Sequence, residues 1–223
     1  MKFLYNKEAS KDIITIDGDS YKYLFKVRRI KVGSLVELRN MQDDMLYIYK
    51  VVSVNRKSAT LEIVTKELSI VESKRSLTIG WCIIDPKIVD KSIASLNEIG
   101  VERVVFIKCA YSQANFKIKK DRLEKILINS SQQCGRSSLM RIDFANSIND
   151  FLRENPNSYL LDFSKRYIDE SADGIESIVV GCEGGISKDE RALFKDETIV
   201  GFNTPLILRS ESAAIGIATK ILI

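Results

Sequence analysis

The sequence LTIGWCIIDP at residues 77–86 indicates the fold of the larger part of the chain. Its first eight residues are almost wholly apolar, which is typical of a strand that is covered on both faces of a sheet. Asp85 then supplies a helix N-cap and Pro86 the first helical position. After a stretch with helical spacing, Gly100 stands where a helix end favours a left-handed residue. Residues 101–107 form a second apolar strand, so this strand–helix–strand unit predicts a parallel sheet.

The chain downstream continues this alternation. We expect a basic amphipathic helix at 119–134, a helix opened by a capping box at 187–190 and a last helix at 211–222. Short strands are expected at 159–161, 177–181 and 199–202. The pattern predicts an α/β domain.

The first third of the chain has a different pattern. Alternation of apolar and polar residues predicts strands at 35–39, 45–54 and 59–64, interrupted by a short helix at 21–29 with Asp19 or Ser20 as its N-cap. Several short strands joined by turns favour a small β-barrel. The polar residues 72–76 are typical of a linker. We therefore expect two domains, a β-barrel at 1–72 and an α/β domain at 73–223.

Composition excludes several kinds of chemistry. The 223-residue chain has no histidine, which rules out a Ser-His-Asp or Cys-His nucleophile, a histidine base and histidine metal ligands. Its four cysteines lie more than 20 residues apart and form no C-x-x-C pair, so zinc ribbons and thioredoxin-type motifs are excluded. No signal peptide or apolar run of membrane-spanning length is found. We expect a cytoplasmic protein with reduced thiols, no metal and no membrane segment.

Positive charge is concentrated near the N-terminus. Residues 1–75 hold 15 Lys and Arg against 10 Asp and Glu, a net of +5, whereas the remainder holds 19 against 20, a net of −1. This asymmetry suggests an anionic partner such as a nucleic acid. A slightly basic, solvated surface would give the same numbers.

Two segments have residues suited to a binding site. Gly181-Cys182-Glu183-Gly184-Gly185 follows an expected strand, and such a turn lets backbone groups approach a ligand, although glycine turns are also common as structural elements. Residues 203–214 place a proline, an apolar triplet, an arginine, hydroxyls and a glutamate at the start of the last helix. The alternative for this second segment is a capped helix start with Ser210 as N-cap.

Taken together with three further motifs, these segments resemble the ribosomal RNA small subunit methyltransferase E family of the SPOUT (trefoil-knotted) methyltransferase superfamily. The family's Gly-Pro-Glu-Gly-Gly is present as residues 181–185 with cysteine in place of proline, and the second half of its last loop as residues 207–213. The other matches are Gln132-Gln133-Cys134-Gly135-Arg136, Glu98-Ile99-Gly100-Val101 and the basic element Val27-Arg28-Arg29-Ile30-Lys31-Val32-Gly33. The chain departs from the family at 203–206, which lacks the usual glycine and arginine, and near 94–95 and 111–112.

The resemblance implies a PUA-like RNA-binding barrel followed by a knotted α/β domain that acts as a homodimer. It implies binding of S-adenosylmethionine and methylation of N3 of a uridine in 16S ribosomal RNA, within the small ribosomal subunit. The cofactor-binding residues that it implies are Gly181, Glu183, Gly184, Gly185, Asn203, Leu206, Leu208 and Ser212. RNA contacts are expected at Arg28, Arg29, Lys31 and, on the second domain, Arg136.

Methyl transfer from a sulfonium needs alignment and a dry site rather than a metal or a histidine, which agrees with the composition. Because the uracil N3–H must lose a proton, we expect Arg209 to stabilise negative charge and Glu211 to accept the proton, although Glu211 could instead support the loop. Two alternatives stay open. One is a SPOUT enzyme acting on another RNA or position, and the other is a non-catalytic RNA-binding protein of ribosome assembly.

Overall fold

The computed structural model describes residues 1–113, 115–170 and 172–223, and it divides into two compact units. The first contains residues 1–72 and 131–139, and the second contains 73–130 and 140–223. The expected domains at 1–72 and 73–223 remain our proposal for the domain boundary, while in the structure the segment 131–139 groups with the first unit.

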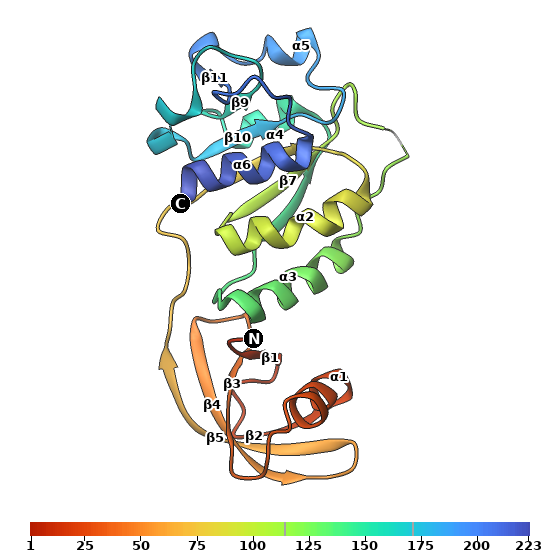
Figure 1. The fold of residues 1–223 in the computed structure, drawn as a ribbon, viewed down its shortest axis with the longest axis vertical. Coiled ribbons are helices and arrows are strands. Elements are labelled where there is room, and N and C mark those ends of the chain that lie inside the picture. Colours follow the sequence, from red (N-terminus) through yellow and green to blue (C-terminus); the bar gives the residue numbers. More distant parts are fainter. Residues whose placement is uncertain (114, 171) are drawn as a thin grey trace. The chain divides into compact units, whose positions relative to one another are not determined.

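The first unit is built on a five-stranded sheet with the strand order β1-β3-β4-β5-β2 (Figure 1). Its elements are β1 (Leu4–Tyr5), β2 (Ile13–Asp17), α1 (Gly18–Tyr21), a π-helical segment (Lys22–Val27), β3 (Leu35–Arg39), β4 (Met45–Val54) and β5 (Ser58–Leu68). All pairs are antiparallel except β1 with β3. The helix begins one residue after Asp17, so the expected N-cap at Asp19 or Ser20 is wrong.

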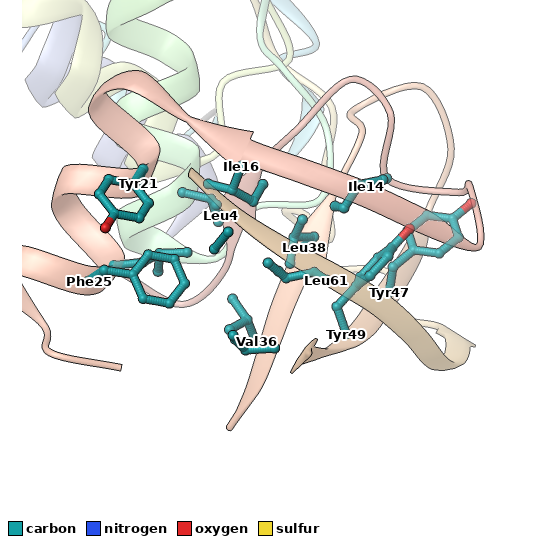
Figure 2. Packing of buried hydrophobic residues seen from close by; sticks show 14 residues of the cluster. Leu4, Ile14, Ile16, Tyr21, Phe25, Val36, Leu38, Tyr47, Tyr49 and Leu61 are labelled. Carbon is teal, nitrogen blue, oxygen red and sulfur yellow. The ribbon is translucent and has the colours of Figure 1, made fainter. Parts of the chain in front are cut away.

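Inward-facing residues of this sheet form one apolar core with the short helix (Figure 2). Leu38, Tyr49 and Leu61 from three adjacent strands are fully buried. Tyr21 and Phe25 of the helical segment pack their rings 5.1 Å apart over this core. The period-two alternation seen in the sequence thus buries one face of the sheet, as expected for a small β domain.

The second unit is a six-stranded parallel sheet with the order β11-β9-β10-β6-β7-β8. Its strands are β6 (Thr78–Cys82), β7 (Arg103–Ile107), β8 (Arg141–Ala145), β9 (Tyr159–Leu161), β10 (Ser177–Val180) and β11 (Ile199–Val200). Its helices are α2 (Pro86–Ile99), α3 (Lys120–Cys134, shared with the first unit), α4 (Ile148–Glu154), α5 (Lys188–Arg191) and α6 (Ser210–Leu222), with 3₁₀ turns at Ile168–Glu170, Ala172–Gly174 and Asp196–Thr198. The predicted α/β class is confirmed.

Consecutive residues of β6 show that both faces of this sheet are covered. A Cβ added at Gly80 would lie 2.9 Å from the ring of Phe151, which belongs to α4. Trp81 points to the opposite face and donates a hydrogen bond to Ser210 at the start of α6. The apolar run at 77–84 is therefore the expected doubly covered strand.

Local helix signals behave as predicted. Asp85 accepts a hydrogen bond from the backbone N–H of Lys87, Pro86 opens α2, and Gly100 ends it with φ of 106°. Ser187 and Glu190 form the complete capping box of α5. Strand β8 and helix α4 lie in a region for which the sequence patterns gave no prediction.

Candidate functional site

The glycine-rich segment forms a tight turn directly after β10. The N–H of Gly185 donates to the carbonyl of Cys182 over 2.9 Å, which closes the turn. Gly185 has φ of 76°, a left-handed conformation that residues with a Cβ rarely adopt. Glu183 and Gly184 are exposed at the tip, so backbone groups and a carboxylate are open to a ligand there.

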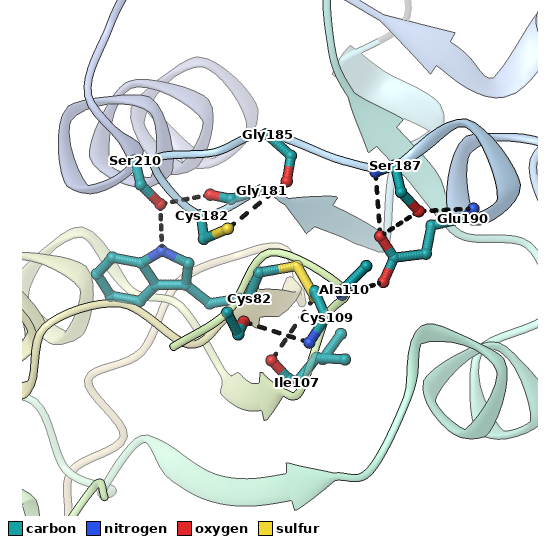
Figure 3. The surroundings of a disulfide bond; sticks show 12 residues. Cys82, Ile107, Cys109, Ala110, Gly181, Cys182, Gly185, Ser187, Glu190 and Ser210 are labelled. Carbon is teal, nitrogen blue, oxygen red and sulfur yellow. Dashed lines mark hydrogen bonds between the residues drawn. A yellow bond between two sulfur atoms is a disulfide. The ribbon is translucent and has the colours of Figure 1, made fainter. Parts of the chain in front are cut away.

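A buried serine joins this turn to the last helix (Figure 3). The Ser210 hydroxyl donates to the carbonyl of Gly181 over 2.5 Å and accepts the indole N–H of Trp81 over 2.8 Å. Ser210 is 6% exposed and Trp81 is fully buried. Arg209 is the N-cap residue, without a side-chain capping bond, so the alternative of Ser210 as N-cap is wrong. The hydroxyl that could have capped the helix instead holds the glycine turn against it.

The last loop presents its predicted cofactor residues to solvent. Asn203, Leu206 and Ser212 are exposed, and Leu208 is 39% exposed. Because β10 and β11 run parallel, with β9 between them, this loop and the glycine turn leave the same edge of the sheet. The carboxyl ends of these strands therefore place both predicted cofactor segments at one edge.

The two predicted catalytic residues flank Ser210 and have different surroundings. Arg209 is exposed. Glu211 is half-buried, and its Oε2 atom is fully buried without a hydrogen-bond partner in the part of the chain that the structure describes. A buried carboxylate oxygen costs free energy when it has no donor. Because this oxygen has no exposed surface, a ligand can reach it only when the Glu211 side chain turns outward.

A second loop, which follows β7, packs against the glycine turn. A Cβ added at Gly184 would lie 2.9 Å from the Cβ of Tyr111. The backbone N–H of Ala110 donates to Glu190 over 2.8 Å, so the capping carboxylate of α5 also fixes this loop (Figure 3). Tyr111 therefore occupies part of the space beside Gly184.

A disulfide between Cys82 and Cys109 corrects the expectation that all thiols are reduced (Figure 3). Cys82 is the last residue of β6, and Cys109 lies two residues after the end of the neighbouring strand β7. Their Cα atoms are 5.8 Å apart. The bond ties the end of β6 to the start of the loop that carries Tyr111. Cys182 and Cys134 are free, and burial raises the pKa of the Cys182 thiol.

The four predicted RNA contacts differ in their exposure to solvent. Arg28, Arg29 and Lys31 are exposed, and within the described residues none of them forms an ion pair. Arg136 is 7% exposed, its Nε lies 3.4 Å from the hydroxyl of Ser138, and its segment groups with the first unit. Arg136 as an RNA contact on the second domain stays a prediction, although the structure groups its segment with the first unit.

Sequence reasoning missed Trp81 and Tyr111 as parts of this site, and it placed Ser210 in the candidate segment 203–214 without its bond to the glycine turn. Trp81 was interpreted as one apolar residue in a buried strand, although it is the only tryptophan, and its N–H needs an acceptor when buried. That requirement was the available signal. Nothing in the sequence indicated that Tyr111 contacts Gly184.

The described residues show neither a cluster of metal ligands nor a membrane-spanning helix. No group of three or more Cys, Asp or Glu side chains there is arranged to hold a metal ion. No helix in the same residues is long and apolar enough to cross a membrane.

Comparison with known proteins gives consistent matches over nearly the whole chain. Residues 71–222 match the family described as RNA methyltransferase domain, and residues 16–64 match the family described as RNA methyltransferase PUA domain. The chain is 34% identical over 222 residues to the ribosomal RNA small subunit methyltransferase E of Helicobacter pylori, with 98% of each chain covered.

Solved structures share the fold. A methyltransferase of Legionella pneumophila, solved with bound SAM, has a TM-score of 0.80 at 21% identity and covers 99% of this chain and 96% of its own. The ribosomal RNA small subunit methyltransferase E of Neisseria gonorrhoeae, bound to S-adenosylmethionine, has a TM-score of 0.75 at 18% identity, with 98% and 95% covered. At these identities the likeness shows that the two-domain fold, a PUA-like β half-barrel followed by a parallel α/β sheet, is common to all three.

Proposed function

Because the chain belongs to the ribosomal RNA small subunit methyltransferase E family, we propose that it methylates N3 of a uridine in 16S ribosomal RNA with S-adenosylmethionine as methyl donor. The observation that carries this proposal is that Ser210 connects the glycine turn to the start of α6. Its hydroxyl bonds the carbonyl of Gly181, and the next residue, Glu211, holds a buried carboxylate oxygen without a partner in the described structure. A glycine turn and an unsatisfied carboxylate therefore lie at one helix start.

The residues at this edge fit the cofactor. The backbone at exposed Gly184 and half-buried Gly185 and the carboxylate of Glu183 can bind the polar groups of an amino acid and a ribose, while Leu206 and Leu208 offer apolar surface to an adenine. Bound S-adenosylmethionine supplies an electrophilic methyl group on a sulfonium. We assign its binding to Gly181, Glu183, Gly184, Gly185, Asn203, Leu206, Leu208 and Ser212.

The residues flanking Ser210 supply the protein's part in the chemistry. Formation of the bond from uracil N3 to the methyl carbon would break the bond from that carbon to sulfur, and the proton on N3 must leave. The acceptor that we propose is the carboxylate of Glu211, whose buried oxygen has to turn toward the base. Arg209 is exposed next to it and stabilises negative charge that develops on the uracil ring. The target base must leave its stack to reach these groups.

The first unit would bind the RNA backbone through Arg28, Arg29 and Lys31. These side chains are exposed and free of ion pairs within the described residues, so they are available to phosphates. Replacing Arg28 and Arg29 by alanine should weaken RNA binding and flatten the plot of log K against log salt concentration by about two phosphate contacts. A variant with the wild-type slope would show that these cations do not contact RNA.

Further features follow from the family as proposals. We propose that the chain acts as a homodimer in the cytoplasm, on 16S ribosomal RNA within the small ribosomal subunit. We also propose that its last loop and α6 thread an earlier loop as a trefoil knot.

Nucleoside mass spectrometry of 16S ribosomal RNA tests the proposal. RNA from cells that lack the gene should gain one 3-methyluridine when it is incubated with the protein and S-adenosylmethionine. Glu211→Gln should slow single-turnover methylation by about two to three decades while calorimetry shows nearly unchanged cofactor affinity. Methylation of another RNA or atom would favour a different SPOUT activity, and absence of cofactor binding would favour a non-catalytic assembly protein.

Arg209→Ala provides the matched test of charge stabilisation. We expect a loss of about 10²–10³-fold in rate, again with intact cofactor affinity. Loss of cofactor binding would instead place Arg209 in the binding site, and a wild-type rate would remove it from the mechanism.

A further inference from the structure

An exposed aromatic ring stands just beyond the carboxyl end of β9, followed by two cations. Phe163 is 79% exposed, and Lys165 and Arg166 are exposed beside it. We infer that Phe163 is a stacking platform for one unpaired base of the RNA substrate, whose neighbouring phosphates are bound by Lys165 and Arg166. The inference rests on the proposed function in one respect, that the substrate is RNA.

The platform lies at the same edge of the sheet as the proposed cofactor segments. Strand β9 pairs in parallel with both β10 and β11, so the loops that follow these three strands all begin at the same end of the sheet (Figure 1). The loop after β9 is also tied to the helix after the glycine turn, because Arg191 of α5 pairs with Asp162 over 2.7 Å. A base on Phe163 would therefore be held at the edge where we place the methyl transfer.

The residues on either side of Phe163 are fixed, which makes its exposure a property of a rigid loop. The N–H of Asp162 donates to Val200 over 2.9 Å, and the Ser164 hydroxyl donates to Ile199 over 3.0 Å. A Cβ added at Gly201 would lie 2.8 and 3.0 Å from the carbonyl oxygens of Ser164 and Asp162. The residue after β11 therefore packs closely against this loop. A ring carried by a backbone that is already fixed needs less ordering on binding than a ring on a mobile loop.

Charge around the ring favours an anionic ligand. Asp162 is neutralised by Arg191, and Asp169 by Lys220. Lys165 and Arg166 have no ion-pair partner among residues 1–113, 115–170 and 172–223. Two free cations beside an aromatic face match the pattern by which proteins bind single-stranded nucleic acid, with bases on rings and phosphates on cations.

The chemistry of the proposed reaction also calls for such a surface. A uridine can be methylated at N3 only when it is unpaired and unstacked, since N3–H is its Watson–Crick donor. The nucleotides next to it then lose a stacking partner, and an aromatic ring at the edge of the site replaces that partner.

Binding of two fluorescent twelve-residue probes, measured by anisotropy, tests the inference. One probe is oligouridylate and the other is an abasic phosphate backbone of equal length. Phe163→Ala should weaken oligouridylate binding by about 5- to 150-fold, the loss measured when a stacking ring is removed, and leave the abasic probe unchanged. Phe163→Trp should bind oligouridylate as tightly as the wild type does, whereas Lys165→Ala with Arg166→Ala should weaken the binding of both probes.

Phe144→Ala is the matched control. Phe144 is 50% exposed and lies on β8, which is the outermost strand on the side of the sheet away from β11 and β9. It should leave oligouridylate binding unchanged, so a loss as large as that of Phe163→Ala would overturn the inference.

Three other results would overturn it. Equal affinity of Phe163→Ala and wild type for oligouridylate would remove the platform. Weaker binding of S-adenosylmethionine by Phe163→Ala in calorimetry would assign the ring to the cofactor, and dissociation of an oligomer in sedimentation would assign it to a contact between copies. The probes carry no particular target sequence, so failure to methylate 16S ribosomal RNA would contradict the proposed function without changing the outcome at Phe163.

Discussion

Removal of the Ser210 hydroxyl should destabilise the second unit more than any other single serine substitution that we consider. In Ser210→Ala, the indole N–H of Trp81 and the carbonyl of Gly181 both lose their hydrogen bond. Trp81 is fully buried, so water cannot replace the lost partner of its N–H. A buried polar group left unsatisfied costs about 1–3 kcal/mol, and this cost applies in full to the N–H of Trp81, whereas Gly181 is only half-buried; we therefore expect a loss of about 1–3 kcal/mol in the free energy of unfolding.

Urea unfolding followed by tryptophan fluorescence measures this loss, because Trp81 is the only tryptophan in the chain. Ser92→Ala is the matched control: Ser92 is also buried, at 7% exposure, but its hydroxyl bonds only the carbonyl of Ile88 in its own helix. The control should lose much less stability. Calorimetry should also show weaker S-adenosylmethionine binding by Ser210→Ala alone, since the glycine turn has lost its anchor.

A double-mutant cycle with Trp81→Phe separates the hydrogen bond from the cavity that the smaller ring leaves; because Trp81→Phe removes the only tryptophan, urea unfolding of all four proteins of the cycle is followed by circular dichroism. We expect a coupling energy between the two positions of about 0.5–3 kcal/mol. If Ser210→Ala were no less stable than Ser92→Ala and the coupling were zero, the hydroxyl would not hold the two segments together, and our reasoning about the site would be refuted.

Three further predictions concern the glycine turn and the cysteines near Ser210. Gly184→Val should lower stability by about 1–3 kcal/mol through its clash with the neighbouring tyrosine and weaken S-adenosylmethionine binding; unchanged affinity in calorimetry would separate the turn from the cofactor. Reduction of the Cys82–Cys109 disulfide, which closes a loop of 27 residues, should cost about 3.5 kcal/mol in urea unfolding, and the reductant should have no such effect on Cys109→Ser. Since burial raises the pKa of Cys182, its thiolate is scarce at pH 8 and becomes abundant only as the pH rises above the usual thiol range, so iodoacetamide should label exposed Cys134 first. Equal labelling rates of the two thiols at pH 8, measured by peptide mass spectrometry, would contradict this order.

The boundaries of several elements could be predicted from the sequence because short-range hydrogen bonds decide them. Asp85, Pro86 and Gly100 mark the ends of α2 as expected, and Ser187 with Glu190 caps α5. Each of these signals depends on groups within about four residues of one another, which the sequence places together in any fold. The alternation of the first unit and the apolar run at 77–84 likewise predicted the faces that are buried.

Strand β8 shows what such patterns miss. Its sequence, Arg141 to Ala145, carries charges that do not resemble a strand of a buried parallel sheet. In the structure Arg103 of β7 pairs with Asp143 over 2.6 Å and with Glu154 of α4 over 2.9 Å. The two charges of β8 are acceptable because Arg103 of β7 neutralises Asp143, and Glu102, the residue before β7, neutralises Arg141. Neither partner can be recognised without the strand order.

The sequence by itself determined the class of the fold, the family and the segments that bear the site. Only the tertiary structure decided how those segments are joined: Ser210 bonds Trp81 across 129 residues instead of capping its helix, Arg136 is buried, and Cys82 forms a disulfide with Cys109. A hydroxyl, a guanidinium or a thiol can satisfy its bonding capacity locally or with distant groups. Which of these occurs depends on the neighbours that sheet order and packing bring within about 3 Å, and that information is not local to any stretch of the chain.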